Sequence, residues 1–558
     1  MIVRGLFAFL LVTAPFARAA AGEGGAATVQ PLATEAALEA FRRGGNAVDA
    51  AAAAAFTLGV VDGHNSGVGG GCFILVRSPD GKIVCLDGRE VAPAGASRDM
   101  FLREGKVDEQ LSKTGPLASG VPGAAAAWKS AVEKFGKLPF ADALRAGIRH
   151  AREGFPIDEV YARKLKATAA DLARFPASKE IFLQPDGQPW PKGHVLVQKD
   201  LAASYEKLAG EGTDWFYRGG FAQATADYMK ENGGLITAED FAHYRLVERE
   251  PLVTRFREWQ IVGVPPPSSG GVHVAQMLNI LTHLPQEEPG TPEFTHTVVE
   301  AMKLAFADRA YWLGDPAFVS VPKGLVSDDY ARQLALRIDP RRATPVDKHA
   351  DPPDWQSNSF EKHTTHLATA DSGGFWVSAT ATINTAFGSK VVVPGTGILL
   401  NDEMDDFSVA PGAPNHFRLV GGEANSVAPG KRPLSSMSPT IVLDAKDRPV
   451  MSIGAAGGPT IISQVLLGLL CCLDHDMSPS AALALPRFHH QWRPDQIRLE
   501  ASMPEKVKDS LRALGHKLDE QKEFGACQII GQGKDGIFIG ASDPRVPGAA
   551  GTTTTTTE

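Results

Sequence analysis

The hydrophobic residues of this 558-residue chain follow two different spacings along its length. Apolar residues recur at the helical period through much of 120–245 and 294–335. Apolar and polar residues alternate, as in half-buried strands, near 68–90, 258–264, 364–400 and 438–453. No segment repeats another. The pattern therefore predicts a fold with both helices and strands, in separate blocks of sequence.

A helix and a glycine-rich loop are predicted early in the chain. Asn46, with Asp49 three residues later, is placed to cap a helix over Ala47–Leu58. The loop His64–Gly71 follows this helix and leads into a strand over Cys72–Val76. A phosphate-binding loop has the opposite order, with a strand first, then glycines, then a helix. The glycines therefore do not indicate a nucleotide site.

The first residues have the pattern of an export signal. Arg4 precedes an apolar run over Gly5–Val12, and Ala17-Arg18-Ala19 supplies a small-residue cleavage site. An uncleaved membrane anchor is the alternative, but the run is shorter than the roughly 20 residues that a spanning helix needs. We therefore expect residues 1–21 to be a signal peptide, and the protein to be periplasmic or secreted with no remaining membrane span.

Composition narrows the class of partner. The chain is 43% hydrophobic and 22% charged, enough to bury a large core. Its net charge of -8, without a basic block, disfavours nucleic acid and anionic membranes and leaves a small molecule as the expected partner. The cysteines number five, with no CxxC pair, so neither a disulfide framework nor a zinc site is indicated.

Two threonine-rich strands are predicted to form a hairpin. Thr364–Ala370 is followed by the turn Asp371–Gly374 and by a second strand over Phe375–Ile383. Folding about the middle of the turn places Thr364 opposite Ala381, or opposite Thr382 if the register shifts by one residue. Two threonine hydroxyls could therefore meet.

The first threonine of this hairpin could become a nucleophile. An interior threonine lacks a base, but a cut between His363 and Thr364 would create an α-amino group with a pKa near 8 that could serve as one. The polar segment 340–361 in front of it would make such a cut sterically easy. On the hairpin alone, however, an ordinary pair of strand threonines is the simpler interpretation.

Three later loops each have two interpretations. The turn Asn401–Ser408 contains four carboxylates and could bind an ammonium or simply be solvated; it lacks the glycine and closing glutamate of a calcium loop. Ser435 and Ser436 could donate hydrogen bonds to an anion or form a plain loop. The glycines of Gly454–Gly458, between a strand and a helix starting near Pro459, could form an oxyanion hole or a tight turn.

Several ordered motifs carry a resemblance to a known family. They include PLATEAALEAFRRGGNAVDAA, PPPSSGGVHVAQMLNIL, TTHLATADSGGFWVSATATINTAFG, GTGILLNDEMDDFS and KRPLSSMSPTIV. In this order and spacing they resemble the γ-glutamyltransferase family, also called glutathione hydrolases, from about Val29 to Arg545.

The resemblance implies a fold class and a maturation step. The family belongs to the N-terminal nucleophile hydrolases, so we expect an α+β, four-layer αββα sandwich. It also implies a precursor that cleaves itself at His363-Thr364 into two interlocked subunits, 22–363 and 364–558. We expect the threonine-rich end, 552–558, to be disordered.

The resemblance also implies residue roles. Thr364 would be the nucleophile and Thr382 would orient it. The substrate ammonium would be held by Asn384, Glu403 and Asp406. The substrate α-carboxylate would be held by Arg89, Ser435 and Ser436. The tetrahedral oxyanion would be stabilised by Gly457 and Gly458.

The implied reaction cleaves the γ-glutamyl amide of glutathione and related compounds. Thr364 would form a γ-glutamyl ester, which water hydrolyses or an amino acid or peptide amine intercepts. No metal or organic cofactor is expected, and His489 and His490 are interpreted as structural. Phe417 replaces a tyrosine that some bacterial members carry in the lid segment 406–422. The preferred acceptor, the ratio of hydrolysis to transfer and further association stay open.

Two alternatives remain. A cephalosporin or glutaryl acylase of the same family would accept an acyl group without an ammonium, and Asn384, Glu403 and Asp406 argue against it. A non-catalytic, uncleaved binding relative is disfavoured by the intact Thr364 and Thr382.

Overall fold

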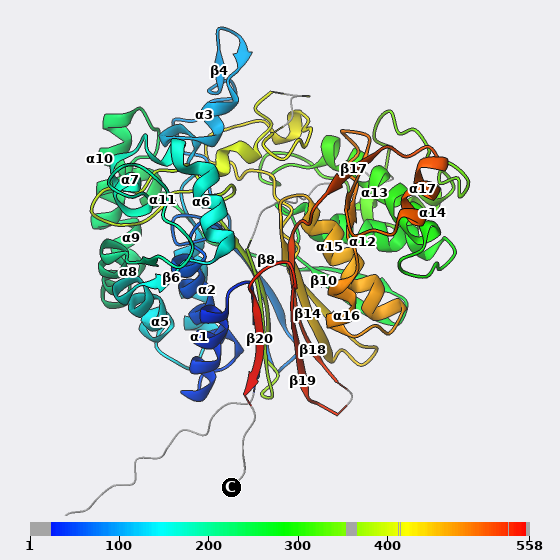
Figure 1. The fold of residues 1–558 in the computed structure, drawn as a ribbon, viewed down its shortest axis with the longest axis horizontal. Coiled ribbons are helices and arrows are strands. Elements are labelled where there is room, and N and C mark those ends of the chain that lie inside the picture. Colours follow the sequence, from blue (N-terminus) through cyan, green and yellow to red (C-terminus); the bar gives the residue numbers. More distant parts are fainter. Residues whose placement is uncertain (1–23, 353–364, 411, 413–414, 534, 554–558) are drawn as a thin grey trace, which may run out of the picture.

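The computed structural model describes residues 24–352, 365–410, 412, 415–533 and 535–553. Two sheets pack face to face in the centre, and a layer of helices covers the outer face of each (Figure 1). Strands β11 and β12 of the first sheet contact β14 of the second, which places the two sheets against each other. The predicted four-layer αββα sandwich is therefore confirmed.

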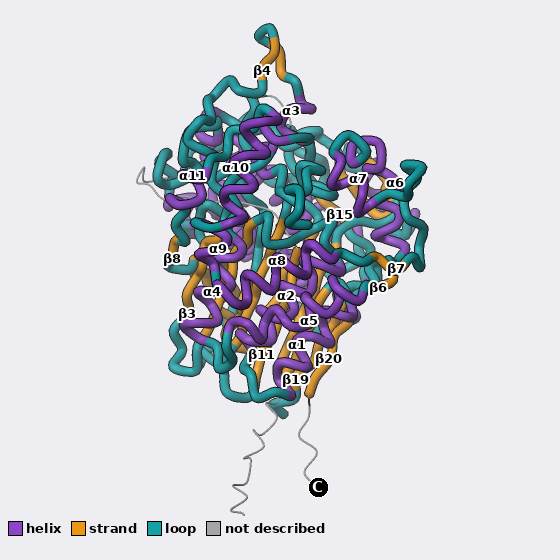
Figure 2. Tube along the Cα trace, turned by 90° about the vertical axis from the view of Figure 1, so that its left-hand side faces the viewer, coloured by secondary structure: helices purple, strands orange, loops and turns teal. Residues whose placement is uncertain are grey.

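The first sheet has seven strands. Their order is β20 (Ala549–Thr553), β1 (Gly24–Thr28), β11 (Thr365–Asp371), β12 (Trp376–Thr382), β2 (Gly71–Arg77), β3 (Ile83–Gly88) and β8 (Val247–Arg249). Its outer face is covered by α1 (Pro31–Arg42), α2 (Ala47–Val61) and α4 (Ala124–Phe135) (Figure 2). Helix α5 (Phe140–Glu153) packs on α2, and α8 (Lys199–Glu211) packs on α5. Helix α2 is alanine-rich, so its backbone can lie close to the strands beneath it.

The second sheet has six strands. Their order is β19 (Phe538–Ser542), β18 (Ala526–Gln532), β14 (Pro449–Ala456), β13 (Thr440–Leu443), β10 (Trp259–Gly263) and β9 (Leu252–Phe256). Its outer layer includes α12 (Ser269–Thr282), α13 (Pro292–Trp312) and α15 (Thr460–Leu469). Each sheet thus combines strands from both sides of the predicted cleavage site.

The other elements surround these four layers. The remaining helices are α3 (Glu109–Lys113), α6 (Glu159–Leu172), α7 (Pro176–Phe182), α9 (Thr213–Tyr217), α10 (Gly220–Asn232), α11 (Ala238–His243), α14 (Asp328–Ala335), α16 (Pro479–Ala484) and α17 (Glu505–Ala513). The remaining strands are β4 (Leu102–Arg103), β5 (Lys106–Val107), β6 (Phe155–Pro156), β7 (Val195–Leu196), β15 (Phe488–His489), β16 (Ile497–Glu500) and β17 (Leu518–Gln521). No helix of the described part of the chain is both long enough and apolar enough to cross a membrane.

The predicted cap of α2 is confirmed. The Asn46 side chain accepts hydrogen bonds from the backbone N–H groups of Val48 and Asp49, and the Asp49 carboxylate accepts one from the Asn46 N–H at 2.9 Å. The first turn also donates to the hairpin, because the Ala47 N–H binds the Asp371 carboxylate at 2.7 Å. The cap therefore fixes α2 against the end of β11.

The predicted hairpin is confirmed as β11 and β12, with the shifted register. Thr365 pairs with Ala381, and the pairing continues to Ala370 opposite Trp376. This register differs by one residue from a fold about the middle of the turn. His363 and Thr364 lie outside the described residues, and so does the signal segment 1–21.

The prediction that the threonine-rich end is disordered is wrong for its first residues. Thr552 and Thr553 belong to β20, which pairs antiparallel with β1. Threonine is β-branched and favours strands, and β1 would otherwise expose an unpaired edge. Residues 554–558 lie outside the described part of the chain.

Candidate active site

A cavity of about 380 Å³ opens where the predicted loops meet. Thr365, at the start of β11, lines it together with Asn384 from the segment after β12. Gly457 and Gly458, after β14, form another part of its wall, and Phe417 lies at its edge. The hairpin and the glycine turn, 75 or more residues apart in sequence, are thus brought to one place.

The glycine turn is shaped by its neighbours. Gly457 has φ 128° and Gly458 has φ 60°, conformations that side chains disfavour. The Thr460 hydroxyl donates to the Gly457 carbonyl at 2.7 Å, and the Gln464 amide donates to the Ala456 carbonyl at 2.9 Å. These bonds hold the turn at the start of α15, with its backbone facing the cavity.

Thr382 lies at the end of β12 and is fully buried. Its hydroxyl accepts a hydrogen bond from the Asn384 N–H at 2.7 Å, while the Asn384 side chain donates to the Asp402 carbonyl at 2.9 Å. The backbone carbonyl of Thr382 lies so close to Gly70 that a Cβ there would sit 1.8 Å from it. The glycines of the early loop therefore serve close packing against the candidate site.

Asn401 fixes the acidic turn. Its side chain donates to the carbonyls of Gly69 at 2.8 Å and Gly120 at 2.9 Å, and accepts from the N–H groups of Gly120 and Glu403. The short 3₁₀ helix Glu403–Asp406 starts from this anchor. The turn is buried, so the solvated-turn interpretation is wrong.

Arg89, just after β3, joins the two predicted recognition groups. Its guanidinium donates to Glu403 and, at 2.6 Å, to Asp406. It also donates to the Pro433 carbonyl at 3.2 Å, next to the predicted serine pair, and to Glu90 at 3.4 Å. The side chains of Arg89 and its three carboxyl partners are completely buried. We call Arg89, Glu90, Glu403 and Asp406 the inner cluster.

Among the described residues, the inner cluster has more carboxyl groups than cations. Three carboxyl groups contact one guanidinium. Burial raises the pKa of Glu403 well above its usual value, with Arg89 acting in the opposite direction. Burial likewise raises the pKa of Glu90 to about 7. A second cation placed here would be favoured because it would allow these carboxyls to ionise.

The serine pair lies beside this cluster. The backbone carbonyl of Ser435 accepts from the Ser269 hydroxyl at 2.6 Å, which fixes the loop against the start of α12. The buried polar atoms that have no hydrogen-bond partner within the described residues include Ser436 Oγ, Glu403 Oε2 and Asn384 Oδ1. Buried polar atoms are seldom left unpaired, so these three are available to a polar ligand.

A second group of polar residues on the cavity wall was not predicted. Asp62 is the residue after α2, His64 and Asn65 follow it, and Lys164 comes from α6. Asn65 connects them, because its amide nitrogen donates to Asp62 at 2.9 Å and its amide oxygen accepts from Lys164. His64 and Asn65 open the predicted glycine-rich loop, whereas no sequence motif marks Lys164. We call Asp62, His64, Asn65 and Lys164 the outer cluster.

Phe417 packs over the glycine turn. A Cβ on Gly458 would lie 2.6 Å from its ring, and its backbone carbonyl accepts from Gln491 at 3.0 Å. The preceding His416 N–H donates to the Asp405 carboxylate at 3.0 Å. His416 and Phe417 are therefore held at the cavity by backbone bonds and by ring packing.

The histidines have structural partners. His489 contacts Ser463 at 3.0 Å and Gln491 at 3.1 Å, and His490 pairs with Asp495. A separate group, His296, Glu300 and His516, could geometrically hold a metal ion. Lys303 already lies 2.6 Å from the Glu300 carboxylate and supplies the positive charge there. The donor set therefore does not fit a metal well.

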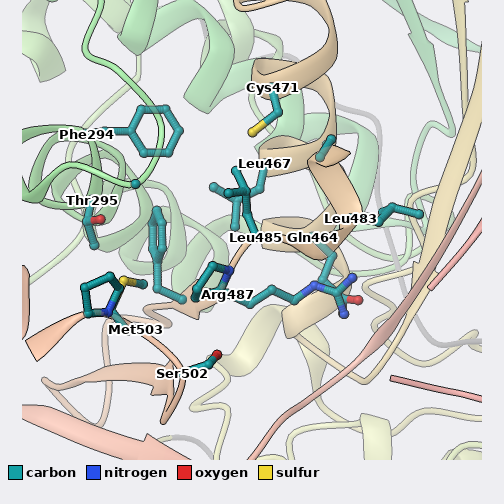
Figure 3. A pocket seen from close by; sticks show the side chains of 16 residues that line it. Phe294, Thr295, Gln464, Leu467, Cys471, Leu483, Leu485, Arg487, Ser502 and Met503 are labelled. Carbon is teal, nitrogen blue, oxygen red and sulfur yellow. The ribbon is translucent and has the colours of Figure 1, made fainter. Parts of the chain in front are cut away.

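A second cavity, of about 190 Å³, lies on the outer side of α15. Phe294, Leu467, Leu483 and Met503 make its wall mostly apolar (Figure 3). The one charged side chain of its wall, Arg487, is paired with Asp543. Thr295, Cys471 and Ser502 also line this cavity, but burial raises the pKa of the Cys471 thiol to about 12, which makes it a poor nucleophile.

Comparison with known proteins finds relatives along almost the whole chain. The sequence model of the family described as Gamma-glutamyltranspeptidase matches residues 33–553. The glutathione hydrolase proenzyme of Escherichia coli (strain K12) is 42% identical over 531 residues, covering 94% of this chain and 91% of that protein. The acylase ACY 1 proenzyme of Pseudomonas sp. (strain SE83) is 37% identical over 545 residues, covering 95% and 93%.

Solved structures share the fold. The crystal structure of cephalosporin acylase from Bacillus halodurans has a TM-score of 0.85 at 30% identity and covers 98% of this chain and 99% of its own. The crystal structure of Helicobacter pylori gamma-glutamyltranspeptidase has a TM-score of 0.56 at 36% identity and covers 57% of this chain and 93% of its own. With its motifs, its four-layer fold and these full-length similarities, the chain belongs to the gamma-glutamyltranspeptidase family of enzymes.

Proposed function

We propose that the enzyme is a γ-glutamyl hydrolase and transferase that acts on glutathione and related small γ-glutamyl compounds. The observation that carries this proposal is the inner cluster, where a buried arginine and an excess of buried carboxyls lie beside a serine pair. A γ-glutamyl group carries an ammonium and a carboxylate on one carbon, and this cluster offers a partner for each.

Substrate recognition follows from the charges. The α-carboxylate binds Arg89 and the hydroxyls of Ser435 and Ser436, replacing part of the contact that Arg89 makes with its own carboxyls. The α-ammonium binds Glu403, Asp406 and Asn384. Two of the unpaired buried atoms, Glu403 Oε2 and Asn384 Oδ1, are acceptors, as an ammonium requires.

Thr364 is proposed as the nucleophile. Continuing the observed hairpin register by one residue would set Thr364 opposite Thr382, whose hydroxyl would then orient it. The freed α-amino group takes the proton of the Thr364 hydroxyl as the oxygen attacks the γ-carbonyl. The N–H groups of the turn at Gly457 and Gly458 receive the oxyanion, and the leaving amine takes up the proton. Water or another amine then attacks the γ-glutamyl ester and releases the threonine.

Maturation and location complete the proposal. The chain cleaves itself at His363-Thr364 into subunits 22–363 and 364–558, which stay together in the shared sheets. Related proteins named as proenzymes support this step, and so does the Helicobacter chain, which aligns along 93% of its own length with 57% of this one. We infer a periplasmic or secreted enzyme from the signal pattern of residues 1–21.

An acylase is the second candidate, because the acylase relative and the cephalosporin acylase structure are both similar to this chain. An acylase substrate without an ammonium would leave the excess carboxyls of the inner cluster unmatched. That cluster is buried and charged here, which favours the γ-glutamyl substrate.

The test uses the wild-type protein and Thr364→Ala. Wild type should run as two bands on a denaturing gel, with the smaller fragment beginning at Thr364, and should hydrolyse γ-glutamyl anilide faster than glutaryl anilide. Thr364→Ala should remain a single inactive chain, because it lacks the hydroxyl that attacks the His363-Thr364 bond. Without that cut, the α-amino group that serves as the base is never formed. A mature, active Thr364→Ala protein would disprove the nucleophile assignment, and preference for glutaryl anilide would favour the acylase.

A further inference from the structure

The outer cluster contains a cation, Lys164, that forms no ion pair within the described residues. Lys164 on α6 is half-buried and lines the same cavity as Asn384 and the glycine turn. Its ammonium donates to the neutral Asn65 amide, and it takes part in no ion pair within the described residues. Burial lowers the pKa of Lys164, so a lysine in this position is costly unless something compensates its charge.

The carboxyl groups of Asp62 and Asp158 favour the charged form of Lys164 through space, but less strongly than burial opposes it, and neither forms an ion pair with it. Asp158 caps α6 by accepting from the Tyr161 N–H at 2.8 Å, and Glu523 is exposed at the rim. Burial raises the pKa of Asp62 to about 7, so this carboxyl is partly protonated near neutral pH. Arg163, also on the wall, adds a second positive charge to the same side.

The histidine of the cluster adds no charge. Burial, with the nearby Lys164 acting in the same direction, lowers the pKa of His64 well below its usual value. The remaining cation of the wall, Arg545, is already paired with Glu500 and Asp543. Within the described part of the chain, the α6 side of the cavity therefore has a positive charge to offer a ligand.

The place of Lys164 in the cavity relates its charge to the proposed reaction. The glutamyl group occupies the inner cluster in the proposed function, so whatever follows the scissile amide must lie in the cavity outside it. A volume of about 380 Å³ suits a group of dipeptide size. Attack by an amine is the reverse of amide cleavage, so leaving group and acceptor pass through the same place.

We propose that Lys164 is a specificity-determining residue that binds the carboxylate of the group beyond the γ-glutamyl amide, in the leaving peptide or in the amino acid or peptide acceptor. This inference rests on the proposed function. It defines the preferred substrate class as γ-glutamyl compounds whose second portion ends in a carboxylate.

The experiment compares two chromogenic donors, γ-glutamyl-4-nitroanilide and γ-glutamyl-3-carboxy-4-nitroanilide. Lys164→Met should lower kcat/KM about tenfold for the carboxylated donor, as loss of one charge-assisted contact predicts, and less than about twofold for the uncharged donor. Lys164→Arg should restore most of the difference. Lys166→Met, an exposed lysine on the same helix, is the matched control and should change neither value.

A second arm addresses the acceptor, by comparing transfer to glycylglycine and to glycylglycinamide. Lys164→Met should remove the preference for the free acid; an effect on donors alone would restrict the role to the leaving group. Equal losses on both anilides, or no loss on either in a normally cleaved variant, would overturn the inference. If wild type cleaves neither anilide, the proposed function itself fails, which is a different result.

Discussion

The outer cluster lines the cavity and the inner cluster is completely buried off its wall, and the two treat charge in opposite ways. In the inner cluster one guanidinium contacts three carboxyls, all completely buried. In the outer cluster one half-buried ammonium contacts an amide and faces a carboxyl whose pKa is raised to about 7. The charges of the inner cluster favour a bound cation, and those of the outer cluster favour a bound anion. The comparison shows how two regions of opposite charge can orient a substrate: its ammonium end binds at the inner cluster and its carboxylate end binds at the outer cluster.

The largest expected effect comes from removing charge from the inner cluster. Asp406→Asn should lower kcat/KM for γ-glutamyl anilide by tens- to thousands-fold, because a desolvated ammonium loses its charged partner, at a cost on the order of 2–5 kcal/mol. Self-cleavage involves no glutamyl group, so the variant should still give two fragments.

Asp405→Asn is the matched control for this variant. Asp405 binds Ser112 at 2.6 Å and the His416 N–H and has no contact with Arg89, so its loss should be far smaller. Arg89→Ala is a poorer test than Asp406→Asn. It would leave buried carboxyls uncompensated and reduce folding stability by about 3–5 kcal/mol. Equal effects of Asp406→Asn and Asp405→Asn would contradict the proposed role of the inner cluster in binding the substrate ammonium.

Raising the pH should strengthen ligand binding at the inner cluster and weaken it at the outer cluster. Between about pH 6 and pH 8, ionisation of Glu90, whose pKa burial raises to about 7, should strengthen ammonium binding and lower the donor KM several-fold. Over the same range Asp62, with a pKa raised to about 7, ionises next to Lys164 and should weaken binding of a carboxylated leaving group.

The measurement is the ratio of kcat/KM for the carboxylated and the uncharged anilide across this range. The ratio cancels the ionisation of the nucleophile, which acts on both donors. It should fall as pH rises. A ratio that stays constant or rises would show that ionisation of Asp62 does not weaken carboxylate binding at Lys164.

A smaller effect is expected from Asp62→Asn. The neutral amide keeps the size of the side chain but cannot become negative beside Lys164, so preference for the carboxylated anilide should increase about threefold at pH 8. The pH dependence of the ratio should flatten. Glu523→Gln at the exposed rim should change the ratio much less, because solvent screens that charge.

The smallest effect is that of salt. The ammonium of Lys164 is half-buried, whereas the inner cluster is completely buried. Raising ionic strength to about 1 M should therefore reduce the carboxylate preference about twofold and leave KM for the uncharged anilide nearly constant. A reversed outcome would mean that the inner cluster is the more solvated of the two.

The fold was predictable where sequence-local signals agree. The cap at Asn46 and the hairpin turn at Asp371–Gly374 involve contacts within a few residues, and both elements formed as predicted. The hairpin register needed one residue of correction, because composition does not specify turn geometry. The strand at Thr552 was missed because its order depends on the distant partner β1.

The site was predictable only through the resemblance. Arg89 and Asp406 are 317 residues apart, and no periodicity relates them. The reason for the glycine at 70 appears only when the Thr382 carbonyl is seen beside it. In the outer cluster, Lys164 has no motif and resembles any other lysine of a surface helix until Asn65 is seen against it.

The position of β1 has a consequence for how the mature enzyme would lose its structure. This strand precedes the proposed cut yet lies between β11 and β20, which both follow it. Once the chain is cut, neither fragment can leave without breaking hydrogen-bonded ladders on two sides of one strand. Heat should therefore melt both fragments in a single transition. Recovery from denaturant would become bimolecular and depend on protein concentration, whereas the uncut Thr364→Ala chain would refold at a rate independent of concentration.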